Sequence, residues 1–339
     1  MSAARIETRF TRLVGIELPI VQAGMSWASS CAALPAAVSA AGGLGVLAAG
    51  PMRPGDLAEA IDEIRRLTDR PFAVNMPLYR KGIDEVLDLL VARRVGVIVA
   101  SQGGPERYLD RFKAIGTICL HVVASERHAL RAAARGVDGL VVVGGEAGGH
   151  PPPELVSTMV VGRAVARAVP SLPIVLGGGI ADGYGLAAAL ALGADAAQLG
   201  TRFLMTPEAR VHHGYRRRIL EASITDTLTV GRGLGMIRVL RNDFATRMEA
   251  AELAGTPEPE RRALFDQSSL KRAAFDGDVD AGKVEAGQTA GLIDDVVPAA
   301  AVVARLVEDY RAAVGRLPRA AQRPAGHDLP HQTRTQHAG

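Results

Sequence analysis

The feature that most constrains the fold is a regular alternation of short apolar runs with segments rich in Ala, Leu and Arg. Alternation of this kind predicts a parallel sheet covered by helices. The predicted strands span residues 19–22, 45–48, 72–75, 95–100, 117–122, 139–143, 173–176 and 194–199. The predicted helices between them span residues 32–41, 54–67, 82–93, 105–115, 125–135, 157–169 and 183–192.

Eight strands with intervening helices predict an α/β fold of the closed (β/α)8 TIM barrel type. Right-handed crossovers would then bring the ends of all eight strands to one mouth. A doubly wound open sheet is the alternative, although its strand number is usually nearer about five to seven.

The alternation stops after Thr201, and the residues that follow are charged and helical in pattern, with a break at Pro257 and Pro259. We therefore predict a barrel over residues 1–206 and 286–316 and a helical lid subdomain over residues 207–285. The Pro-, Gln- and His-rich tail, residues 317–339, is predicted to be disordered.

The composition excludes several classes of protein. Of the 339 residues, 48% are hydrophobic and 22% are charged, which predicts a large core rather than disorder. The net charge is +3 and the arginines are scattered, so we expect no nucleic-acid binding. Two cysteines, Cys31 and Cys119, are too few for a disulfide framework or a zinc site. Without a signal peptide or a long apolar run, we expect no membrane association and a cytoplasmic location.

Glycine-rich turns follow the seventh and eighth predicted strands, where barrels commonly bind a phosphate group. Glycine lets backbone N–H groups approach an anion closely. The alternative is that these glycines only end their strands. The residues expected to bind the cofactor here are Gly177, Gly178, Gly179, Gln198, Gly200 and Thr201.

The turn after the first strand, Ala23-Gly24-Met25, has small side chains at the barrel mouth and is expected to lie against a flat cofactor ring. Met25 and Trp27 have an alternative role in packing the top of the barrel. Asn75, at the end of the third strand, is expected to contact the cofactor rather than to serve only a turn.

The loop after the sixth strand reads Gly-Gly-Glu-Ala-Gly-Gly-His and ends at His150, our candidate catalytic residue. Histidine exchanges protons near neutral pH, and this position lies at the functional end of a barrel strand; the alternative is a surface histidine. Glu146 and Gly149 are counted with the cofactor-binding residues. Glu146 is interpreted as a hydrogen-bond anchor for the loop, since no second carboxylate accompanies it at a useful spacing.

Three other histidines are weaker candidates. His121 ends the fifth strand and is expected to contact the ring or the phosphate, whereas His212 and His213 would reach the mouth from the lid. The chain has no Gly-x-Ser-x-Gly elbow, Walker loop or dinucleotide fingerprint after a strand, which removes common hydrolase and nucleotide-hydrolysing functions.

These segments resemble the nitronate monooxygenases, once called 2-nitropropane dioxygenases, and the related FMN-dependent enoyl-ACP reductases and NADH:quinone reductases. The resemblance extends from about Ile6 to Tyr310. The segments that carry it are PIVQAGMSW, AVSAAGGLGVLAAG, PFAVN, GGEAGGH, PIVLGGGIADG, GADAAQLGTRFL and AGQTAGLIDD. It implies non-covalent FMN, and a histidine at position 150 that removes an α-proton or orients the substrate. It also implies FMN contacts from Asn75, Gln198, Gly200, Thr201, Gly178 and Gly179.

The resemblance leaves the reaction open. A nitronate monooxygenase would use O2 to convert a small-molecule nitronate to a carbonyl compound and nitrite, and this is the first interpretation. A reductase would instead take electrons from NAD(P)H for an enoyl thioester or a quinone, and GMSW and HHGYRRRIL favour that branch. A non-catalytic flavin-binding scaffold is the third possibility. Pro151-Pro152-Pro153 departs from the family pattern and predicts a stiffer loop after His150. The oligomeric state stays open, a homodimer included.

Overall fold

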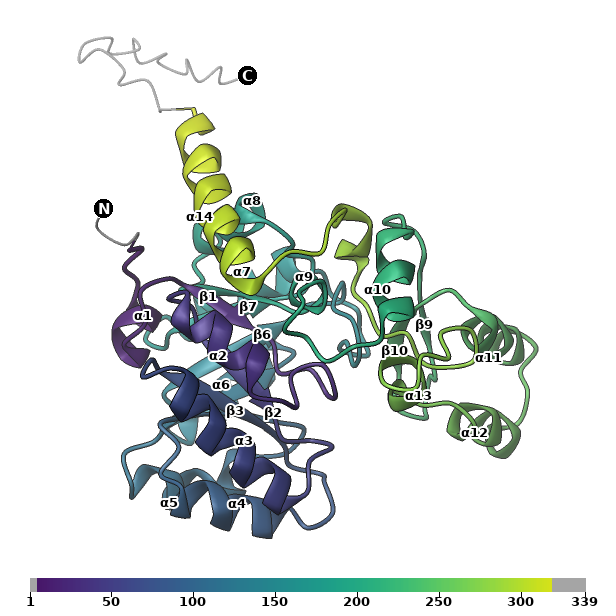
Figure 1. Cartoon of the computed structure of the whole chain (residues 1–339), viewed down its shortest axis with the longest axis horizontal. Helices are drawn as coiled ribbons and strands as arrows, with labels where there is room; N and C mark the ends of the chain where they lie inside the picture. The colour runs from purple at the N-terminus through teal and green to yellow at the C-terminus, as the bar shows by residue number, and fades with distance from the viewer. Residues whose placement is uncertain (1–4, 319–339) are drawn as a thin grey trace, which may run out of the picture.

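The computed structural model describes residues 5–318, and its centre is a closed barrel of eight parallel strands (Figure 1). The strands are β1 (Ile20–Gln22), β2 (Gly45–Ala48), β3 (Phe72–Pro77), β4 (Val97–Ser101), β5 (Ile118–Val123), β6 (Gly139–Val143), β7 (Ile174–Gly177) and β8 (Ala196–Leu199). Each pairs in parallel with its neighbour, β1 pairs with β8, and a bridge from Val21 to Leu44 closes the ring beside β2. The predicted TIM barrel is confirmed, and the doubly wound alternative is wrong.

Helices follow the strands and cover the outside of the barrel. They are α2 (Ala33–Ala40), α3 (Pro54–Leu67), α4 (Ile83–Ala92), α5 (Leu109–Lys113), preceded by the 3-10 turn η1 (Pro105–Arg107), α6 (Glu126–Ala134), α7 (Thr158–Ala168) and α8 (Gly183–Ala191). The short helix α9 (Thr201–Leu204) follows β8, but the barrel position after β8 is filled by α14 (Ala299–Arg316), which packs on α8 and α2. The chain therefore completes its barrel only after a long insertion.

Alternate residues of each strand point to two separate cores. Val46, Ala73 and Val175 face the barrel interior, whereas their neighbours Leu47 and Val74 pack against the helices. Such strands are buried on both faces and read as continuous apolar runs, which is why the sequence pattern located them.

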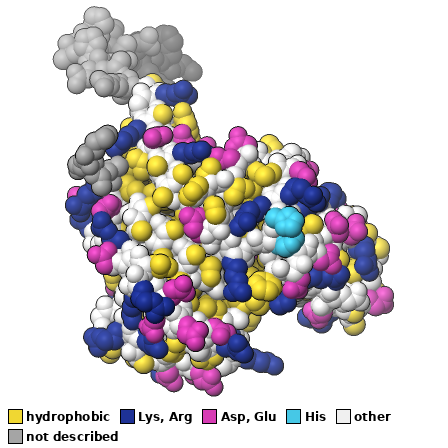
Figure 2. All heavy atoms as spheres, viewed as in Figure 1, with side chains coloured by type: hydrophobic (Ala, Val, Ile, Leu, Met, Phe, Trp, Pro, Cys, Tyr) yellow, Lys and Arg dark blue, Asp and Glu magenta, His cyan; other side chains and the backbone are white. Residues whose placement is uncertain are grey.

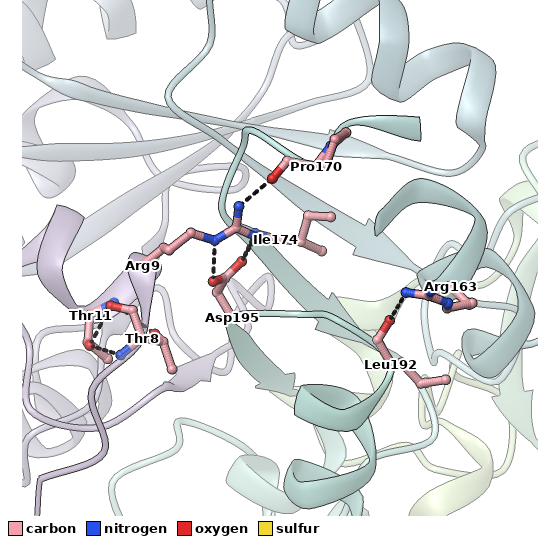
Figure 3. A network of polar contacts seen from close by, with 8 residues as sticks. All are labelled: Thr8, Arg9, Thr11, Arg163, Pro170, Ile174, Leu192 and Asp195. Carbon is pink, nitrogen blue, oxygen red and sulfur yellow. Dashed lines mark hydrogen bonds and ion pairs between the residues drawn. The ribbon is translucent and has the colours of Figure 1, made fainter. Parts of the chain in front are cut away.

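Helix α1 (Arg9–Val14) closes the bottom of the barrel, where Phe10 joins the interior core. The Arg9 guanidinium donates to both carboxylate oxygens of Asp195, at 2.8 and 2.7 Å, and Asp195 also accepts from the backbone N–H of Ile174 at 3.0 Å (Figure 3). The network ties α1 to the starts of β7 and β8. With the bottom plugged, ligands have access from the opposite end.

The insertion between α9 and α14 lies to one side of the barrel (Figure 1). Its elements are α10 (His213–Leu220), β9 (Thr227–Val230), β10 (Ile237–Leu240), α11 (Asp243–Leu253), α12 (Glu258–Asp266), α13 (Leu270–Ala274) and η2 (Gln288–Leu292). The expectation of an all-helical lid missed the antiparallel hairpin of β9 and β10. Its connection contains Gly231, Gly233 and Gly235, all at positive φ, which favours a hairpin turn over a helix.

Charged side chains of both signs are interspersed over the face of the described residues drawn in Figure 2, in agreement with their scatter along the sequence. Among the helices of residues 5–318, none combines the length and the apolar character needed to cross a membrane. The predicted tail, residues 317–339, lies outside the described residues except for its first two positions.

Candidate active site

A cavity of about 1220 Å³ opens at the carboxyl ends of the barrel strands. Its walls come from the turns after every strand except β7 and from the insertion. The predicted site residues that line it are Ala23, Gly24, Met25, Asn75, His121, Gly149, His150, Gln198, Gly200 and Thr201. The predicted residues Glu146, Gly177, Gly178 and Gly179 lie outside its lining.

The turns after β7 and β8 present free hydrogen-bond donors. Within residues 5–318, the backbone N–H groups of Gly178, Gly179, Gly200 and Thr201 have no protein acceptor. Gly178 has a φ of 103°, and a Cβ atom there would lie 2.7 Å from the Thr158 hydroxyl, so only glycine fits. Free amides on two neighbouring barrel turns are suited to holding an anion.

The turn after β1 lies directly against β3. A Cβ atom on Gly24 would stand 2.5 Å from the Asn75 Cβ, so the absence of a side chain allows this contact. The Asn75 amide donates to the Val99 carbonyl at 3.0 Å, which fixes its orientation and leaves its side-chain oxygen without a donor among the described residues. Met25 lines the cavity, and Trp27 both lines it and packs against Phe275 of the insertion, with ring centroids 6.0 Å apart.

The loop that ends at His150 is held from two sides. The Glu146 carboxylate accepts from the backbone N–H of Thr158 at 2.8 Å and from its hydroxyl at 2.7 Å, so it anchors the loop on the start of α7. On the other side, Gly149 exchanges two backbone hydrogen bonds with Arg238 of β10, at 3.2 and 2.7 Å. His150 is exposed at the cavity and makes no hydrogen bond to the described residues.

The three prolines after His150 also line the cavity, with Pro151 and Pro152 buried. Proline has a fixed φ, so this wall is stiff and places the preceding histidine.

The other candidate histidines have different surroundings. The Nδ1 atom of His121 lies 2.9 Å from the Tyr108 hydroxyl, and burial lowers the pKa of His121, which favours the neutral ring. The expectation that His212 and His213 reach the mouth is wrong, because neither lines the cavity. His212 instead caps α10 by accepting from the backbone N–H of Gly214 at 3.1 Å.

Comparison with known proteins fits this geometry. Residues 7–86 and 79–309 match the family model described as nitronate monooxygenase. The chain belongs to the nitronate monooxygenase family. It is 34% identical to a nitronate monooxygenase of Pseudomonas aeruginosa, over 89% of this chain and 99% of that protein. Its relatives are named as oxidoreductases, so this family member is an oxidoreductase.

Two further relatives carry other names. The chain is 32% identical to a (3aS,4S,5R,7aS)-5-hydroxy-7a-methyl-1-oxo-octahydro-1H-indene-4-carboxyl-CoA dehydrogenase of Mycobacterium tuberculosis, over 90% of this chain and 96% of that protein. The solved structure of FabK from Thermotoga maritima superposes with a TM-score of 0.86 and 39% identity, covering 92% of this chain and 98% of that one.

The cavity of this family member also contains groups that the sequence patterns missed. Glu285, from the segment before η2, lines the cavity, and its spacing in the sequence did not identify it as a site residue. Tyr215 of α10 lines it as well and donates its hydroxyl to the Glu285 carbonyl at 2.7 Å. Glu285 directly precedes the AGQTAG motif, and that position was the available signal.

Four basic side chains form a further group at the cavity edge, which we name the basic rim: Arg80, Lys81, His128 and Arg131. Lys81, His128 and Arg131 are exposed, and none of the three makes an ion pair with the described residues. Arg80 is directed at the carbonyl groups of Ala49 and Met52. No single sequence pattern marks these residues, because Arg80 and Lys81 lie in the loop after β3, whereas His128 and Arg131 lie on helix α6.

Proposed function

We propose that this chain is an FMN-dependent oxidoreductase that acts on a large acyl thioester with a phosphorylated tail, of the coenzyme A type. The observation that carries the proposal is the cavity of about 1220 Å³, with the free amides of Gly200 and Thr201 on one side and the basic rim on the other. Pockets for one drug-sized ligand are roughly 300–1,000 Å³. A cavity above that range has room for a cofactor and a substantial substrate together.

The side of the cavity formed by the turns after β8 and β1, next to the turn after β7, fits FMN. The free amides of Gly178, Gly179, Gly200 and Thr201 match the phosphate group, as at other barrel phosphate sites. The side chains of Asn75 and Gln198 supply amide groups beside the backbone of Ala23–Met25, which would lie along the ring. When bound, FMN supplies two-electron exchange with the substrate.

The opposite side fits the substrate tail. The rim residues follow β3 and β5, which lie across the closed ring from β7 and β8. Cations without carboxylate partners attract phosphate groups, and charge-assisted hydrogen bonds to phosphate are among the strongest in proteins. A simple nitronate would leave this rim unused. The CoA dehydrogenase name of the M. tuberculosis relative supports the same substrate class.

His150 is then the residue that takes up the proton released from the substrate carbon next to the thioester carbonyl. It lies at the cavity between the two sides, on a loop stiffened by three prolines and held by Glu146 and Arg238. A fixed base loses less entropy on reaching its target, which increases the rate of proton transfer.

Nitronate oxidation with O2 is the second candidate, favoured by the family description and by the P. aeruginosa relative. The same histidine would serve it, because a nitroalkane also loses an α-proton. A reductase that draws electrons from NAD(P)H uses the same site in the opposite direction.

Anaerobic stopped-flow absorbance of the flavin tests the proposal. We expect a saturated acyl-CoA to bleach the flavin, or an enoyl-CoA to reoxidise flavin that NADH or NADPH has reduced. A pantetheine thioester without the phosphates should react with a higher KM and a similar limiting rate. Bleaching by an alkyl nitronate, with no response to any thioester, would make nitronate oxidation the function. A purified protein that takes up no FMN would overturn both.

A further inference from the structure

We propose that Glu285 is a second proton-exchanging residue of this active site and that it works as a pair with His150. The inference rests on the proposed oxidoreductase function and adds a residue that the family motifs quoted above do not contain. It gives the proton a defined route between the enclosed part of the cavity and solvent.

The position of Glu285 is the first argument. Glu285 is half-buried, and its side chain lines the cavity. A Cβ atom on Gly149, next to His150, would stand 3.1 Å from the Glu285 Oε2. The carboxyl group therefore lies against the backbone that carries the candidate catalytic histidine.

The second argument is that the carboxyl group has no structural task. Within residues 5–318 its oxygens accept no hydrogen bond and form no ion pair. A carboxyl group that lines a cavity and has no protein partner is available to a ligand. Glu146 is the contrasting case, since its carboxylate is fully engaged by Thr158.

The third argument is that one strand positions both residues. Strand β10 pairs with Gly149 through Arg238 and with the Glu285 segment through Val239, and the backbone N–H of Leu240 donates to Val284 at 2.8 Å. These contacts use the edge of β10 opposite β9. The histidine loop and the glutamate segment are thus held side by side on one support.

The charged and titratable groups around Glu285 are few. The Lys283 ammonium lies 3.3 Å from the centre of the Phe265 ring, and the Arg238 guanidinium donates to the Gly145 carbonyl at 2.8 Å. The Tyr215 hydroxyl is committed to the Glu285 backbone carbonyl. Burial raises the pKa of Glu285, while the charges of His150 and Lys283 act in the opposite direction. His150 is therefore the partner that shares the cavity with it.

The geometry assigns an order to the proton transfers. In the oxidative direction, the C–H bond next to the thioester carbonyl breaks and its proton passes to the Glu285 carboxylate. The electron pair of that bond forms the new C=C bond, and FMN, if held at the turns after β7 and β8, would supply the two-electron acceptor for the hydride of the neighbouring carbon. His150, exposed at the cavity edge, then carries the proton from Glu285 to solvent.

Carbon-13 NMR of glutamate carboxyl groups in the FMN-loaded protein tests the pair without any substrate. The Glu285 signal is the one that Glu285→Gln removes. We expect it to titrate above the ordinary glutamate value of 4.5, and to move higher in His150→Ala. A Glu285 carboxyl group that titrates at or below the ordinary value, or that ignores His150→Ala, overturns the pairing. The titration stays decisive even if no thioester reacts, so failure of the proposed function is recognised separately.

Kinetics provide the second arm, with whichever substrate the flavin assay identifies. We expect Glu285→Gln to lower kcat by about 100-fold or more with unchanged flavin affinity, and Glu285→Asp to restore part of the rate. Glu221→Gln, at an exposed glutamate paired with Arg217, is the matched control and should change nothing. An unchanged kcat in Glu285→Gln overturns the proposal. If the Gln and Asp variants lose flavin to the same extent, Glu285 has a structural role and the proposal is also overturned.

Discussion

Across the mouth of the barrel, the side formed by the turns after β7 and β8 offers backbone N–H groups, whereas the side formed by β3, β5 and the insertion offers side chains. The first depends on glycines such as Gly178, where no other residue fits. The second depends on His150, Glu285 and the basic rim, which come from separate parts of the chain. A backbone site can be kept while side chains change around it. The comparison therefore separates a proposed cofactor side built from backbone groups from a proposed substrate side built from side chains.

The largest effect should come from His150→Ala, which tests whether the two sides are independent. General acid–base catalysis contributes about 10²–10⁴-fold, so we expect kcat to fall by that order while FMN affinity stays unchanged. His212→Ala is the control, since that residue caps α10 away from the cavity. Loss of flavin from His150→Ala would contradict the division into two sides.

Gly178→Val should have the next largest effect, on the cofactor side. The added side chain meets the Thr158 hydroxyl at a backbone φ that favours glycine, so we expect FMN affinity to fall by about 30-fold or more. Flavin fluorescence quenching measures this affinity, with circular dichroism as the check on folding. Gly233→Val is the matched control, because Gly233 also has positive φ but has no atom within 4 Å of an added Cβ. A Gly178 variant with normal affinity would show that the phosphate lies elsewhere.

Removing rim charges should have a smaller effect, confined to the substrate side. For the double variant Lys81→Ala, Arg131→Ala we expect KM for an acyl-CoA to rise about tenfold, because each lost phosphate contact is worth about 1 kcal/mol or less at an exposed position. The pantetheine thioester without phosphates should show no change. Arg127→Ala, on the same helix but outside the cavity lining, is the control. An equal rise in KM for both thioesters would show that the basic rim does not bind the phosphate groups.

The smallest expected effect is that of Glu285→Gln on thermal stability. It tests the difference between Glu285, which has no partner among the described residues, and Glu146, which is hydrogen-bonded to Thr158. Because burial raises the folded-state pKa of Glu285, its contribution to stability is complete below the unfolded value near 4.5 and is lost as the pH rises through the folded pKa. Glu285→Gln should therefore raise Tm near neutral pH and leave it unchanged in acid. Thermal denaturation across that pH range measures the difference. A lower Tm at neutral pH would mean that the carboxylate stabilises the fold.

The sequence was sufficient for the barrel and for much of the cofactor side, but not for the substrate side. Predicted strands 45–48 and 139–143 match β2 and β6, because strands buried on both faces are continuous apolar runs between turns. The role of the glycine-rich turns can be inferred from residues that are neighbours in the sequence. Glu285 meets His150 only through tertiary pairing with β10, which no local pattern reveals. The hairpin of β9 and β10 was missed because charged residues and neighbouring helical segments masked its alternation.

The late position of α14 affects the order in which the molecule can be completed during synthesis. This helix covers the barrel between α8 and α2, yet it follows the whole insertion in the chain. While the ribosome is still translating the insertion, the nascent barrel has an uncovered apolar strip beside β8 and β1. Exposed apolar surface of this kind makes an incomplete barrel prone to aggregation until the last helix packs.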